Sequence, residues 1–174
     1  MRVIGLLALT LAGGATLAGC ATVDAPSVVP STADALVSRL PERLGAFQRG
    51  GTTPLSEPNA GSEVAYATGN RAVAGYVQVR RQTDAVAPEP ELRRFVTEAA
   101  AGSSRSMRER GRVSLGHFSC AELEGTYGRQ AVESLACAGA FGGQLVRLRL
   151  TMTRRADRMA EARGFAEAIS AALR

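Results

Sequence analysis

The stretch QLVRLRLTMT, residues 144–153, decides the fold, because its side chains alternate between two chemical classes. From Val146 onwards every second position is apolar, and these residues are Val146, Leu148, Leu150 and Met152. The positions between them are polar: Arg147, Arg149 and Thr151. Successive side chains of a strand point to opposite faces of a sheet, so the pattern predicts a strand with one apolar face and one charged face. We expect the apolar face to contact the core and the charged face to be solvated.

Other segments of the chain share this strand character. They are residues 63–67, 72–80, 112–120 and 130–141, with a first strand close to Leu44 and Phe47. Turn residues at 68–71 and the pair Gly142-Gly143 predict two hairpins.

Three segments have the apolar spacing of helices. The first begins at Ser31 or Thr32 and ends before Pro41, and the last covers about residues 156–173. The middle helix follows a Pro-containing loop, and its apolar stripe extends from Leu92 to Met107. Together the elements predict an α+β domain with a largely antiparallel sheet of five or six strands. The two longer helices are expected to pack on one face of this sheet, in addition to the short N-terminal helix.

The chain begins with a segment typical of export signals. Arg2 is followed by an apolar run from Val3 to Thr16 that contains no charge. At about 1.5 Å per helical residue, these roughly fourteen residues cover about 21 Å, which is less than the roughly 30 Å of a bilayer's hydrocarbon core. A transmembrane helix is therefore not expected here.

Leu17-Ala18-Gly19-Cys20 follows this run and resembles the lipobox of bacterial lipoproteins. The resemblance implies that residues 1–19 are a signal peptide and that Cys20 is lipidated with acyl chains such as palmitate. It also implies that residues 20–30 form a short tether and residues 31–174 a single domain. Because Ala21 follows the cysteine, the enteric sorting rule implies the outer membrane, facing the periplasm. The alternative is an ordinary secretory signal that is cleaved near Ala15 or Ala18.

A second resemblance concerns the start of the domain. Residues 40–50 read Leu-Pro-x-x-Leu-Gly-x-Phe-x-Arg-Gly and are followed by Val64-x-Tyr66. This motif is similar to a group of small secreted proteins and lipoproteins of proteobacteria. It implies no activity.

Cys120 and Cys137 remain as a pair if Cys20 carries lipid. In the oxidising envelope we expect them to form a disulfide. The turn-rich segment 124–128 lies close to their midpoint, which places them opposite each other in a hairpin. The alternative is two buried free thiols.

The sequence contains no motif that assigns catalytic residues, a metal site or a cofactor. His117 is the only histidine, and Glu122 and Glu124 are the closest approach to an acid and base pair. They support only a third hypothesis, a cryptic envelope hydrolase. We therefore expect the protein not to be an enzyme.

Binding is the better-supported class of function. All 21 basic residues are Arg, and the net charge is +5. Tyr76, Arg147 and Arg149 are candidates for binding an anion on the exposed sheet face. The first hypothesis is a lipid-anchored structural or protein-interaction module with an envelope protein as partner. The second is a binding module for an anionic envelope component, either a lipid headgroup or a wall polymer. Nucleic acid is not an expected partner of an exported protein.

Overall fold

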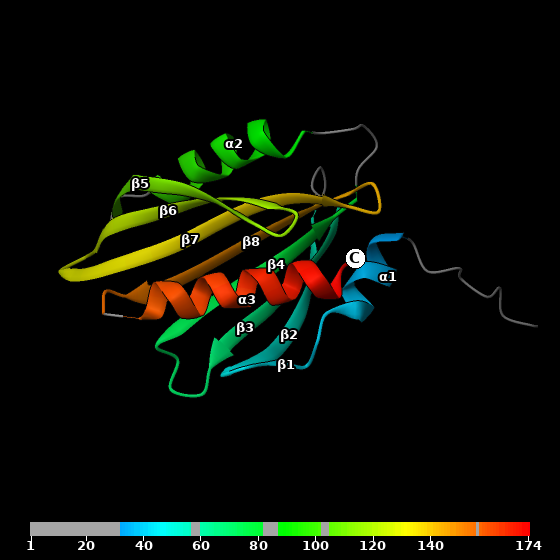
Figure 1. The fold of residues 1–174 in the computed structure, drawn as a ribbon, viewed down its shortest axis with the longest axis horizontal. Helices are drawn as coiled ribbons and strands as arrows, with labels where there is room; N and C mark the ends of the chain where they lie inside the picture. The colour runs from blue at the N-terminus through cyan, green and yellow to red at the C-terminus, as the bar shows by residue number, and fades with distance from the viewer. Residues whose placement is uncertain (1–31, 57–59, 82–86, 102–104, 156) are drawn as a thin grey trace, which may run out of the picture.

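The computed structural model describes residues 32–56, 60–81, 87–101, 105–155 and 157–174 (Figure 1). The predicted signal peptide (residues 1–19), Cys20 and the predicted tether (residues 20–30) lie outside the described residues. In chain order the elements are α1 (Thr32–Arg39), β1 (Arg43–Leu44), β2 (Phe47–Leu55), β3 (Gly61–Thr68), β4 (Val73–Arg80), α2 (Pro88–Ala100), β5 (Arg105–Leu115), β6 (Phe118–Tyr127), β7 (Gln130–Phe141), β8 (Gln144–Thr153) and α3 (Arg158–Ala172).

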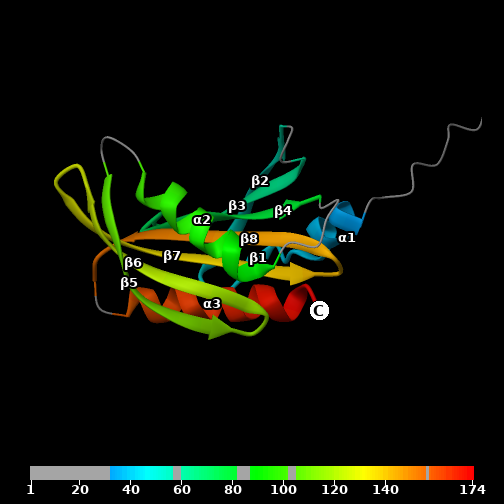
Figure 2. The same ribbon diagram turned by 90° about the horizontal axis from the view of Figure 1, so that it is seen from above.

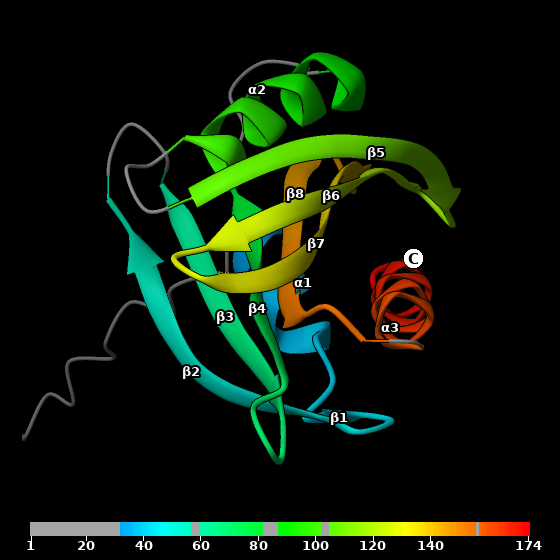
Figure 3. The same ribbon diagram turned by 90° about the vertical axis from the view of Figure 1, so that its left-hand side faces the viewer.

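All strands belong to one antiparallel sheet with the order β1-β2-β3-β4-β8-β7-β6-β5. The α+β class and the antiparallel sheet are confirmed, but the predicted number of five or six strands is wrong, since the sheet has 8. The stretch that decides the fold is β8, which pairs with β4 on one side and β7 on the other. Figure 3 shows the strong twist of the sheet, through which β5 and β6 run at a steep angle to β2 and β3.

Two of the differences from the sequence prediction lie in residues 100–120. The middle helix ends at Ala100, and the predicted helical position Met107 lies on β5, opposite Gly125 of β6. The predicted strand over residues 112–120 is interrupted by a turn at Gly116-His117, where Gly116 has a φ of +61°. This left-handed conformation favours glycine and joins β5 to β6 as a hairpin.

The two longer helices lie on opposite faces of the sheet, not on the same face as predicted (Figure 2). The apolar residues of β8 pack against α3, with Phe165 and Ile169 among the helix residues of this larger core. On the other face, Leu92, Phe95 and Ala99 of α2 pack against β6 and β7. Small side chains at Ala121, Ala136 and Ala138 of these strands allow the helix to lie close to the sheet.

The charged face of β8 is consequently not solvated, which corrects another prediction. Arg147 is 1% exposed and Arg149 is 9% exposed. The alternation of residues 144–153 identifies the two faces correctly, but both faces are covered. A helix that carries acidic side chains can bury a charged face, because it pairs the arginines as it covers them.

Cys120 and Cys137 lie directly opposite each other on β6 and β7, with their Cα atoms 4.0 Å apart. Their sulfur atoms are joined at 2.10 Å, and both residues are buried beneath α3. The disulfide therefore links the two strands inside the larger core.

Replacing both of these cysteines by Ala is expected to lower the free energy of unfolding by about 3 kcal/mol, because the bond closes a loop with a sequence separation of 17. Urea denaturation of the oxidised wild type and the double variant measures this difference. In denaturant, maleimide should label the two thiols of the wild type only after reduction. Labelling without reduction would contradict the disulfide.

Candidate ligand-binding groove

A cavity of about 270 Å³ opens on the α2 face of the sheet. Its lining comes from β4, β5, β6, β7 and β8, namely Gly75, Tyr76, Met107, Tyr127, Val132, Arg149 and Thr151. Because Arg149 also contacts Ala99, the cavity lies beside the C-terminal end of α2. We call it the Tyr76–Arg149 groove.

Arg149 is fixed in this groove by the backbone and by a buried hydroxyl. Its Nη2 donates a hydrogen bond to the carbonyl oxygen of Ala99 at 3.2 Å, and its Nε donates to Ser134 Oγ at 3.3 Å. Ser134 Oγ in turn donates to the Leu150 carbonyl oxygen at 2.7 Å. The guanidinium is thus held in one orientation, which reduces the entropy that it loses when it binds a ligand.

Tyr76 lies beside Arg149, because the two residues are direct partners in the register of β4 and β8. Its ring lies 6.5 Å from that of Phe95, measured between centroids. Burial raises the pKa of the Tyr76 hydroxyl, against the opposing effect of Arg149. The hydroxyl therefore stays protonated at neutral pH and is a hydrogen-bond donor.

The apolar wall of the groove was not predicted from the sequence. Met107, Val132 and Tyr127 supply it, and Tyr127 is 56% exposed at the end of β6. Gly75 lies against β8, where a methyl group would collide with the carbonyl oxygen of Arg149. The groove thus combines the guanidinium of Arg149 and the hydroxyls of Tyr76, Tyr127 and Thr151 with largely apolar surroundings.

Arg147 does not line the groove, although the sequence places it beside Arg149. It lies beneath α2, where it forms an ion pair with the buried Glu91 and a second one with Glu98 at 2.8 Å. Its guanidinium carbon lies 4.8 Å from the centroid of the Phe95 ring. The structure therefore assigns Arg147 to the attachment of α2, and of the three predicted residues only Tyr76 and Arg149 share the groove.

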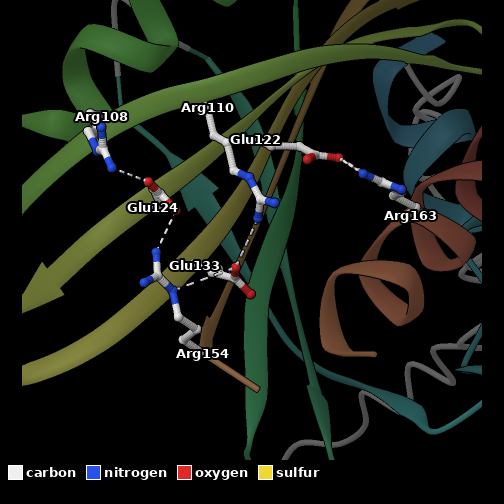
Figure 4. Close-up of polar contacts among 7 residues, drawn as sticks. All are labelled: Arg108, Arg110, Glu122, Glu124, Glu133, Arg154 and Arg163. Carbon is white, nitrogen blue, oxygen red and sulfur yellow. Dashed lines mark hydrogen bonds and ion pairs between the residues drawn. The ribbon is translucent and has the colours of Figure 1, made fainter. Parts of the chain in front are cut away.

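Glu122 and Glu124 form ion pairs at the α3 face of the sheet (Figure 4). Glu122 accepts a hydrogen bond from Arg163 Nε of α3 at 2.6 Å. Glu124 accepts hydrogen bonds from Arg108 and Arg154, each at 2.5 Å. The neighbouring Glu133 pairs with Arg110 at 3.6 Å and with Arg154 at 3.8 Å. Glu124 and Glu133 share Arg154, so their ion pairs link β5, β6, β7 and the residue that follows β8. The pair of Glu122 and Arg163 is separate and links β6 to α3.

His117, the other candidate for hydrolase chemistry, lies elsewhere. It is exposed in the turn before β6 and lines a separate cavity of about 360 Å³ with α1 and the C-terminal end of the chain. Its backbone N–H donates to Ser170 Oγ at 2.8 Å, and its ring lies 6.0 Å from Phe141. Glu122 and Glu124 lie towards the opposite end of β6, so the fold does not assemble these three residues into one site.

Comparison with known proteins adds no assignment, since neither a known family model nor a curated protein matches the sequence. Within the described ranges, no group of three or more His, Cys, Asp and Glu side chains is arranged to hold a metal ion. Among the same residues, no helix has the length and apolar character needed to cross a bilayer.

Proposed function

We propose that this protein is a lipid-anchored protein of the bacterial envelope, attached through Cys20, whose domain binds an anionic envelope component in the Tyr76–Arg149 groove. The observation that carries the proposal is the position of Arg149, a 9% exposed guanidinium that lines an otherwise largely apolar cavity. The anchor rests on the lipobox at residues 17–20 and on the apolar run before it.

The chemistry of the groove suits an anion. The positive charge and the N–H groups of a guanidinium match the oxygens of a carboxylate or a phosphate. The protonated Tyr76 hydroxyl, on the adjacent strand, adds a neutral donor. Pockets of this kind use a few polar groups to orient a ligand and apolar walls to hold it.

A protein-interaction module is the second candidate, and Tyr127 is the observation that favours it. This tyrosine is 56% exposed at the rim of the groove. Exposed tyrosines often provide much of the binding energy at protein interfaces.

Arg149→Gln is expected to weaken binding to anionic components about tenfold, because a charge-assisted hydrogen bond contributes roughly 1.5–3 kcal/mol. The measurement compares the retention of full-length protein on vesicles containing phosphatidylglycerol and on wall fragments. All variants carry Cys20→Ala, so that no acyl chain contributes to retention and the apolar run 3–16 contributes equally in all of them.

Arg129→Gln is the matched control, since Arg129 is exposed in the turn between β6 and β7 and does not line the groove. It removes the same charge and should leave retention within about twofold of the parent. Equal losses in the two variants would mean that net charge alone, and not the groove, retains the protein.

A further inference from the structure

We propose that the ligand of the Tyr76–Arg149 groove is a monoanionic amphiphile, with one anionic head group that binds Arg149 and one apolar chain that lies along Met107, Val132 and Tyr127. This inference rests on the proposed function and narrows it to one chemical class.

The number of charges in the groove favours a single anionic group. Arg149 is the one guanidinium among the described residues that line it, and the remaining lining residues are neutral. A polymer with an anion in every repeat is better matched by a row of cations on an open polar surface. A ligand that fits this groove presents one anion and covers apolar side chains with the rest of its surface.

The order of the strands separates the head of the ligand from its chain. Arg149 and Tyr76 lie on the adjacent strands β8 and β4, whereas Val132, Tyr127 and Met107 lie on β7, β6 and β5 in turn. Neighbouring strands are about 4.8 Å apart, so the three steps from β8 to β5 cover about 14 Å across the sheet. The path is diagonal, because Val132 lies opposite Thr153, further along β8 than Arg149. The apolar side chains therefore continue away from the cation in one direction, which suits an extended chain.

The size of the groove limits the ligand to one chain at a time. Its volume of about 270 Å³ is at the lower end of ligand pockets, which are roughly 300–1,000 Å³. Tyr127 at the exposed end leaves the path open to solvent, because more than half of this residue is accessible. A longer chain can extend past it.

Binding of decanoate, decanol and acetate to the full-length Cys20→Ala protein tests the proposal by isothermal titration calorimetry. Decanoate should bind saturably, decanol at least tenfold more weakly, and acetate without saturation at millimolar concentration. Arg149→Gln should bring the affinity for decanoate close to that for decanol. Equal affinities of the parent protein for decanoate and decanol would overturn the assignment of the head group to Arg149.

Two variants test the path of the chain. Met107→Trp fills the groove near β5 and should weaken decanoate binding at least tenfold, whereas Met107→Leu should retain it. Tyr127→Ala is the alternative if Met107→Trp does not fold, because it removes a mostly exposed side chain. It should weaken decanoate binding several-fold. Unchanged affinity in folded Met107→Trp and Tyr127→Ala would overturn the assignment of the apolar chain.

Competition distinguishes the sources of the amphiphile and separates this inference from the proposed function. Displacement of the protein from phosphatidylglycerol vesicles by decanoate would support a membrane phospholipid, and decanoate binding without displacement would support a free amphiphile. Retention on wall fragments that is sensitive to Arg149→Gln, without decanoate binding, would preserve the proposed function and overturn the amphiphile. Absence of all binding would overturn both.

Discussion

Arg147→Leu is expected to lower the free energy of unfolding by about 3 kcal/mol, because it leaves the carboxylate of Glu91 buried without its closest buried partner. Arg147 and Glu91 are each 1% exposed and form an ion pair beneath α2. Removal of one member of such a pair typically costs about 3–5 kcal/mol. The lower end applies here, since Arg94 and Arg80 also pair with Glu91, Arg80 at 3.9 Å.

A double variant separates the charge from the packing in this prediction. Arg147→Leu combined with Glu91→Leu removes both buried charges and should recover most of the lost stability, because apolar side chains can replace a buried pair at little cost. Urea denaturation of the two single variants and the double variant gives the interaction energy directly. Additive losses in the double variant would show that Arg147 acts through its packing on Phe95 and not through its charge.

This buried pair also explains where the sequence prediction was wrong. The alternation of residues 144–153 assigns side chains to two faces, but it contains no information on what covers each face. That information was present in α2, where Glu91 and Glu98 are seven residues apart and thus share a helix face with Phe95. A helix that presents two carboxylates beside an apolar stripe is suited to a sheet face that carries arginines.

The candidate site was predictable only in part, for a related reason. Tyr76 and Arg149 follow from strand alternation, and the pairing of β4 with β8 brings them together. The position of Met107 in the groove could not be predicted in this way. The sequence placed Met107 at the end of the middle helix, whereas it lies on β5, and its face depends on the register of that strand. That register shifts between Glu109 and Gly111, and a shift of one residue transfers a side chain to the opposite face.

The position at which α2 ends explains why Arg147 and Arg149, on the same face of β8, have different surroundings. The helix covers Arg147 with Glu91, Phe95 and Glu98, but it ends at Ala100 and contacts Arg149 through the Ala99 carbonyl oxygen. Beyond this point the sheet face is not covered by the helix, and the groove begins. The length of α2 therefore decides which part of the charged face lies beneath the helix and which part lines the groove.

Cys20→Ala is expected to abolish acylation and to weaken the attachment of the protein to the membrane, a larger effect than any of the losses of stability above. Each buried methylene of an acyl chain contributes about 0.8 kcal/mol to membrane binding, and one chain alone anchors only marginally. The lipobox resemblance implies several chains on Cys20, so removing its thiol removes all of them together. Fractionation of cells measures the loss of membrane attachment. Mass spectrometry measures the loss of processing, since the unmodified variant should keep the mass of its precursor.

The other two cysteines provide the control for the anchor. The variant with Ala at positions 120 and 137 loses the disulfide but keeps Cys20, so it should stay in the membrane fraction even though its domain is less stable. A wild-type protein that carries no acyl mass, and a Cys20→Ala variant that is cleaved like the wild type, would contradict lipidation and would favour the secretory signal cleaved near Ala15 or Ala18. The geometry of the groove would be unaffected by that result, because the residues that line it lie within the folded domain.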